Sequence, residues 1–146
     1  MPEGLDLVTW HLAATWGMVG VIWVMQLISY PAFGQVDGAS FPAYHKAHCD
    51  RITLVVVPLM TVELLTGLLL LESPPAALDG ERTAGLWVAT GLLAVVWGVT
   101  GLVSAPLHGA LRSGNRAVLV PRLVRTNWVR TLAWTARGWL VAGWTG

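Results

Sequence analysis

The chain has few charged residues and almost no cysteine, and both shortages narrow what it can be. Only 12% of its 146 residues are charged, whereas 55% are hydrophobic. A soluble domain usually carries about 25% charged residues, so this composition indicates an integral membrane protein. The single cysteine, Cys49, cannot form an intramolecular disulfide and therefore indicates no redox compartment.

Several motifs of known chemistry are also absent. The sequence has no glycine-rich phosphate loop, no Gly-x-Ser-x-Gly elbow, no Cys-x-x-Cys pair and no His-Glu-x-x-His motif. Nucleotide binding, serine hydrolysis and zinc proteolysis therefore lose support. The net charge of +1 gives no reason to expect a nucleic-acid partner. We also expect no cleavable signal peptide, because the first residues include Glu3 and Asp6 without a basic stretch. We expect no internal repeat either.

Four apolar segments predict an all-α fold, an integral membrane four-helix bundle with four transmembrane helices in a single domain, 1–146. About 20 apolar residues at a rise of 1.5 Å cross the ~30 Å hydrocarbon core of a bilayer. The expected spans cover residues 7–28, 52–71, 84–105 and 127–143, the second with an N-terminal extension from residue 40. Tyr30-Pro31 should end the first span and Pro106 should kink or end the third, because proline opposes helix at and before its position.

Polar residues recur on one face of the expected spans. Glu63 is the only charge in the second span and shares a helical direction with His45 if that helix continues through Pro58. The first span has such a face at His11, Thr15, Met18, Ile22, Gln26 and Ser29, the third at Thr90, Thr100, Ser104 and His108, and the fourth at Asn127, Arg130, Trp134 and Arg137. Four such faces predict a bundle with a polar interior.

The depths of Glu63 and Arg137 match in an antiparallel bundle. Glu63 lies about twelve residues into the second span and Arg137 about eleven into the fourth from the same side, at a helical rise of 1.5 Å per residue. We therefore predict an ion pair between them, which neutralises each charge. The pair has either a structural or a catalytic role. In the catalytic case Glu63 or a histidine moves protons, and Arg130 or Arg137, near Asn127, stabilises developing negative charge.

The histidines suggest a cofactor. His45, His48 and His108 fall at one end of the bundle, and two histidines at i, i+3 with a third from another helix are a candidate transition-metal site. The alternative is a set of solvated interfacial histidines. His11, toward the other end, is either a hydrogen-bonded interior residue or an axial haem ligand. We take His11 and His108 as the candidates for cofactor binding, with haem or a transition metal as the cofactor.

The segments Ala105-Pro106-Leu107-His108 and Asn127-Trp128-Val129-Arg130-Thr131 carry one family resemblance. They resemble the end of span three and the start of span four in the anthrone-oxygenase-like family of small four-helix membrane proteins, where a Pro-Leu-Asn or similar turn precedes an Asn/His-x-x-Arg-Thr element. The resemblance covers a minor part of the chain and implies an oxygenase that acts on polycyclic phenolic anthrones. His108 stands here in place of the usual Asn.

A second set of short segments carries another resemblance. His11, Tyr30, Arg51 with Pro58-Leu59-Met60, and Thr66-Gly67-Leu68 are similar to landmarks of the four-helix, haem-binding membrane protoporphyrinogen oxidases. This resemblance implies that the early histidine, here His11, is associated with haem.

These patterns favour an oxidoreductase or oxygenase that acts on a lipophilic small molecule at a buried polar His/Glu/Arg site. The alternatives are a non-catalytic accessory subunit of a larger membrane complex and a small proton-coupled transporter. The expected partners are the lipid bilayer, a lipophilic small molecule, and further copies or subunits of a membrane complex. The expected location is the bacterial inner (cytoplasmic) membrane.

Basic residues predict the orientation, because lysine and arginine favour the cytoplasmic side. The links between spans one and two and between spans three and four hold Lys46, Arg51, Arg112, Arg116, Arg122 and Arg125, whereas the opposite side holds Arg82 alone. Both termini should therefore lie on the non-cytoplasmic side.

Topology reporters provide the test of this orientation. A tag fused at Gly146 and a tag inserted near Asp79 should both report a non-cytoplasmic location, because the basic links lie on the other side. A cytoplasmic signal from either tag would overturn the orientation.

Overall fold

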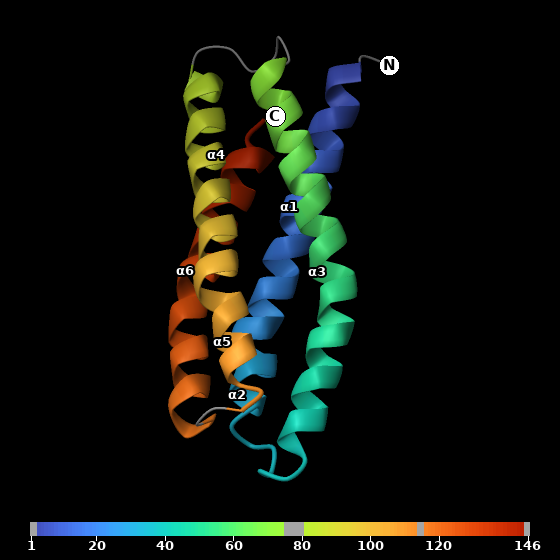
Figure 1. Cartoon of the computed structure of the whole chain (residues 1–146). Coiled ribbons are helices and arrows are strands. Elements are labelled where there is room, and N and C mark those ends of the chain that lie inside the picture. The colour runs from blue at the N-terminus through green and yellow to red at the C-terminus, as the bar shows by residue number, and fades with distance from the viewer. Residues whose placement is uncertain (1–2, 75–80, 114–115, 145–146) are drawn as a thin grey trace.

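Four helical rods run antiparallel along the length of the molecule (Figure 1). The computed structural model describes residues 3–74, 81–113 and 116–144, and within these residues all regular structure is helical. The first rod consists of α1 (Glu3–Val24), the π-helical segment η1 (Met25–Ser29) and α2 (Tyr30–Ala32), and the second is α3 (Phe41–Glu72). The third consists of α4 (Glu81–Val99), the π-helical segment η2 (Thr100–Ser104) and α5 (Ala105–Ala110), and the fourth is α6 (Arg116–Ala142).

The outside of the bundle is apolar enough for a membrane. Three helical stretches, Leu7–Ala32, Phe41–Glu72 and Thr83–Ala110, are long and hydrophobic enough to cross a bilayer. Large apolar side chains are exposed along all four rods, among them Trp10, Leu54, Leu102 and Trp139. The predicted helical bundle of membrane type is confirmed. The fourth span stays a prediction, because α6 carries several arginines.

The start of α1 and the end of α6 lie at the same end of the bundle (Figure 1). The opposite end, which we call the basic end, carries the loop 33–40 and the turn at residues 111–113. Which end faces the cytoplasm stays a prediction, and the side chain of Arg82 lies outside the described part of the chain.

The predicted polar faces point inward. In α3 the helix continues through Pro58, and His45 and Glu63 are both buried, as their shared direction predicts. The polar faces of the first rod and of α6 are buried as well, at His11, Thr15, Met18, Ile22, Gln26, Asn127, Arg130, Trp134 and Arg137, whereas Ser29 is half-buried. On the third rod only Ser104 of the predicted face is buried. The Thr90 and Thr100 hydroxyls bond to carbonyls of their own helix.

The first rod ends one residue after Tyr30-Pro31, close to the predicted end, whereas the third rod does not end at Pro106. The first rod continues to Ala32 and the third to Ala110, because a π-helical segment precedes each proline. In that wider turn the Tyr30 N–H bonds to the Met25 carbonyl, and the Ala105 N–H bonds to the Thr100 carbonyl. The proline ring would otherwise meet the carbonyl four residues back, so the wider turn lets each rod continue.

The two proline turns have the same sequence pattern. Residues 27–34 read LISYPAFG and residues 102–109 read LVSAPLHG, so the expectation of no internal repeat was wrong for this segment. Both copies lie at the basic end of the bundle, one at the end of the first rod and one at the end of the third (Figure 1). The repeat brings Tyr30 and His108 close together, with their ring centroids 5.5 Å apart.

Asp37 orders the loop that precedes α3. Its carboxylate accepts the backbone N–H groups of Ala39 and Ser40 at 2.9 and 3.0 Å. The hydrogen bond from the Ser40 side chain, followed by the backbone bonds, holds the pKa of the Asp37 carboxyl below its usual value. Arg116, at the start of α6, donates to the carbonyls of Val36 and Asp37. Arg116 thus connects the start of α6 to the loop that precedes α3.

Candidate functional site

Glu63 of α3 and Arg137 of α6 form a buried ion pair. The Arg137 Nε donates to Glu63 Oε1 at 2.8 Å, and neither side chain is more than 1% exposed. The second carboxylate oxygen accepts the indole N–H of Trp134 at 3.0 Å. The ion pair predicted from matching depths is confirmed.

The other nitrogens of Arg137 reach two more rods. One donates to the Ala89 carbonyl of α4, and the other to Nε2 of His11 on α1 at 2.7 Å. Because arginine only donates, His11 Nε2 is an acceptor and the ring proton lies on Nδ1. That nitrogen donates to Thr66 Oγ1 at 2.7 Å, and Thr66 donates onward to the Val62 carbonyl at 2.6 Å.

We call His11, Glu63, Thr66, Trp134 and Arg137 the core network. Its hydrogen bonds engage both nitrogens of His11 and all three nitrogens of the Arg137 side chain. A haem ligand needs a free ring nitrogen, so this geometry gives no support to His11 as a haem ligand. None of the five lines the cavity described below. The core network therefore has the geometry of a structural junction.

Asn127 and Arg130 belong to a second network one to two turns nearer the basic end. The Asn127 amide donates to Gln26 Oε1 at 2.9 Å, and its own oxygen accepts Arg130 at 3.1 Å. Arg130 also donates to Ser104 Oγ at 3.4 Å, and its guanidinium lies 5.2 Å from the centre of the Trp134 ring. Asn127 is fully buried and does not line the cavity, so it positions Arg130.

Arg130 has no counter-charge among the described residues. Its side chain is only 5% exposed, its two hydrogen bonds go to neutral oxygens, and its Nε–H is buried without a partner. A buried charge normally pairs with an opposite charge. Arg130 therefore differs from Arg137, and its unused donor makes it the better candidate for ligand contact.

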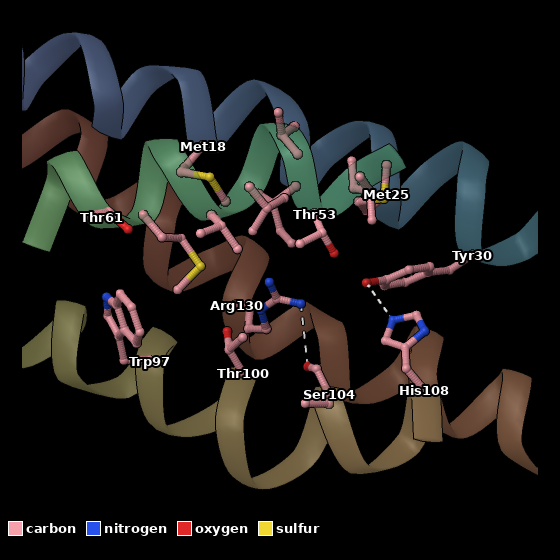
Figure 2. Close-up of a pocket in the computed structure, with 17 residues that line it drawn as sticks. Met18, Met25, Tyr30, Thr53, Thr61, Trp97, Thr100, Ser104, His108 and Arg130 are labelled. Carbon is pink, nitrogen blue, oxygen red and sulfur yellow. Dashed lines mark hydrogen bonds between the residues drawn. The ribbon is translucent and has the colours of Figure 1, made fainter. Parts of the chain in front are cut away.

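A cavity of about 340 Å³ lies beside Arg130, and all four rods line it. Figure 2 shows Trp97 and Thr61 at one end of it, Tyr30 and His108 at the other, and Arg130 between them. Most of the remaining lining is apolar, for example Met18, Ile22, Val56 and Met60. Two lining residues, Val57 and Trp97, are also exposed at 53% and 38%, so the cavity meets the outer surface between α3 and α4.

The histidines at the basic end converge, as the sequence predicts. The His108 ring centroid lies 5.3 Å from that of His45 and 6.3 Å from that of His48. The atoms that come together, however, are His45 Nε2, His108 Nδ1 and Cys49 Sγ. Cys49 thus takes the place predicted for His48, whose ring packs edge-on against Phe33 and whose Nε2 is buried without a partner.

Sequence reasoning missed several contributing residues. Cys49 follows His45 by four residues on the same helical face, a spacing that offered a usable signal. Gln26 was assigned to the correct buried face, but its partner Asn127 lies on another helix. The sequence predicts Tyr30 only as the end of a span, yet the residue lines the cavity and its hydroxyl lies 3.2 Å from His108 Nε2. Nothing in the sequence alone places Gln26 beside Asn127 or Tyr30 beside His108.

Comparison of the chain with protein-family models, with curated proteins and with solved structures finds no match in any of the three. The two family resemblances therefore stay predictions.

A double-mutant cycle tests the structural role of the ion pair. Glu63→Gln and Arg137→Met should each lower the free energy of unfolding by about 3–5 kcal/mol, because each leaves the other charge buried without compensation. Combining the two should recover much of that loss. The measurement is thermal unfolding of the purified protein in detergent. Losses that simply add in the double variant would contradict the pairing.

Gly67 provides a second test of the core network. A Cβ at this position would lie 3.2 Å from His11 Cε1 and 3.3 Å from Leu93 Cδ2, and the His11 ring is held on both sides. Gly67→Ala should therefore destabilise the protein by about 1–3 kcal/mol through overpacking. The control is Gly91→Ala, where a Cβ meets nothing within 4 Å. Equal melting temperatures for both variants would show that the His11 ring is free to move.

Proposed function

We propose that the protein binds a lipophilic small molecule with an acidic oxygen in the cavity and stabilises its anion for oxidation. The observation that carries this proposal is Arg130, a buried guanidinium beside the cavity with no carboxylate partner among the described residues and with an unused N–H. A ligand oxygen that carries negative charge is the group that such a site lacks.

Tyr30 supplies a second donor. In Figure 2 its hydroxyl points along the cavity wall toward Arg130, and it is hydrogen-bonded to His108 Nε2 at 3.2 Å. When the His108 Nε2 carries the ring proton and donates to the Tyr30 oxygen, the Tyr30 proton is available to the ligand. Two donors on the wall of one cavity provide an oxyanion site, which is most effective where water is excluded.

The cavity suits a ligand that arrives from the bilayer. Its volume of about 340 Å³ falls at the small end of the range for small-molecule sites, about 300–1,000 Å³. The lining is largely apolar, and the outer rim near Val57 and Trp97 belongs to the surface of two helices apolar enough to cross a membrane. An aromatic or polycyclic ligand with one polar edge matches this distribution.

The resemblance to anthrone-oxygenase-like proteins suggests a reaction with these requirements. An anthrone loses a proton to give an electron-rich oxyanion, and the ring carbon of that anion reacts with molecular oxygen. The ring CH₂ becomes C=O, O₂ supplies the ketone oxygen, and its second oxygen leaves as water with the two hydrogens. In this proposal Arg130 and Tyr30 hold the oxyanion, Asn127 and Ser104 orient Arg130, and Glu63 and Arg137 maintain the bundle.

A charge-removing substitution tests the anion site. Arg130→Gln should weaken binding of an anthrone-type phenol by about 10- to 100-fold, because a hydrogen bond to a charged group contributes about 1.5–3 kcal/mol. The measurement is titration of the detergent-solubilised protein, followed by the absorbance change of the ligand as it ionises and by oxygen consumption. Arg125→Gln is the matched control, since Arg125 is an exposed arginine on the same helix.

The outcomes separate the alternatives. Binding with ligand ionisation and oxygen consumption supports the oxidation. Ionisation without oxygen consumption would reduce the protein to a carrier or accessory subunit that uses the same site. If Arg130→Gln and Arg125→Gln bind the phenol equally well, Arg130 is not the anion site.

A further inference from the structure

Three metal-ligating atoms meet at the basic end of the bundle, next to the cavity that His108 also lines. His45 Nε2 lies 3.0 Å from His108 Nδ1, and Cys49 Sγ lies 3.6 and 3.8 Å from these two nitrogens. The three atoms form a triangle whose centre is about 2.0 Å from every corner, the length of a zinc–imidazole bond. An ion slightly out of this plane would reach the longer metal–sulfur distance of about 2.3 Å.

The three candidate ligand atoms all lie within 4.8 Å of one another. The nitrogens of His45 and His108 face each other at 3.0 Å, which satisfies one hydrogen bond. The Cys49 sulfur completes the triangle, and its contacts to these two nitrogens are its side-chain hydrogen-bond contacts within the described residues. Neighbouring ligands around a tetrahedral ion with such bond lengths are separated by about 3.3–3.6 Å. The sides of this triangle need to change by only a few tenths of an ångström.

Local structure explains why these atoms converge. His45 and Cys49 are four residues apart on α3, so their side chains share one helical face. His108 comes from α5, just beyond the π-helical turn and Pro106. The ring of His45 is only 1% exposed, whereas Cys49 and His108 are partly exposed, which leaves a route of entry for an ion.

The donor set restricts the ion. One thiolate and two imidazoles, with no carboxylate, suit zinc or copper and not magnesium or calcium. The contact of His108 with Tyr30 is also compatible with a metal at His108 Nδ1. A metal on Nδ1 leaves the ring proton on Nε2, and this N–H then donates to the Tyr30 oxygen at 3.2 Å. A second-sphere partner of this kind fixes the orientation of a metal-bound histidine.

We propose that His45 Nε2, Cys49 Sγ and His108 Nδ1 bind a zinc or copper ion, with a fourth position open. The ion fastens α3 to α5 at the basic end. It also connects to the cavity through His108 and Tyr30, although the site itself does not depend on the proposed oxidation. The inference replaces His48 of the predicted histidine set with Cys49.

The test begins with elemental analysis of protein purified without chelator, which should show close to one zinc or copper per chain. The apoprotein is then titrated with Co²⁺, which reports a thiolate ligand through a charge-transfer band, and Zn²⁺ should displace it. Cys49→Ser should abolish the band and weaken affinity by more than the about 10- to 100-fold that loss of a second-sphere partner costs. His48→Gln is the matched control and should retain the band.

Thermal unfolding shows whether a variant has lost a metal ligand or has failed to fold. Zn²⁺ should raise the melting temperature of the wild-type apoprotein and of His48→Gln, but not that of Cys49→Ser. A wild-type protein without a thiolate band, a band that survives in Cys49→Ser, or an equal loss in His48→Gln would overturn the proposed ligand set. Cys49→Ser should still bind the phenol and Arg130→Gln should still bind the ion, so the two proposals fail separately.

Discussion

The arrangement of the bundle depends on how one buried guanidinium is satisfied. Arg137 comes from α6 and contacts Glu63 of α3, His11 of α1 and the Ala89 carbonyl of α4, so a single side chain joins all four rods. In an apolar surrounding an unpaired donor is costly, and each rod must therefore keep its depth and rotation for the contacts to persist. The rods pack through otherwise interchangeable apolar side chains, and the guanidinium supplies the specific register that those contacts lack.

The second buried arginine shows how a small change in partners separates a structural junction from a site. Arg130 lies two turns from Arg137 on the same inward face, yet its partners are the neutral oxygens of Asn127 and Ser104. These partners orient the guanidinium of Arg130 but do not neutralise its charge, and the cavity lies beside it. An arginine that is fully paired within the protein stabilises the fold. An arginine without a counter-charge can instead form an ion pair with a ligand anion, and that ion pair favours binding.

The sequence predicts the class of fold and the Glu63–Arg137 pair because both follow from periodicity and rise along single helices. It does not predict which nitrogen of His11 accepts a hydrogen bond, since that depends on Thr66 and Arg137, which belong to two other rods. It also does not predict that the third rod continues past Pro106, because proline is compatible with a helix that widens into a π-turn before it. The preference for His48 over Cys49 arose from reading cysteine only as a disulfide partner, whereas the i, i+4 spacing from His45 already favoured it.

The two copies of the proline turn, one in the first rod and one in the third, place different side chains at equivalent positions of the basic end. The segments LISYPAFG and LVSAPLHG form the same widened turn, but Tyr30 aligns with Ala105 and Phe33 with His108. One copy therefore contributes a hydroxyl and an apolar ring, and the other contributes an imidazole in the position of that ring. The Phe33 ring packs edge-on against His45, His48 and His108. A shared backbone geometry thus supplies the positions, and the differences at two of them create the polar pair Tyr30–His108 that links the cavity to the histidine and cysteine cluster.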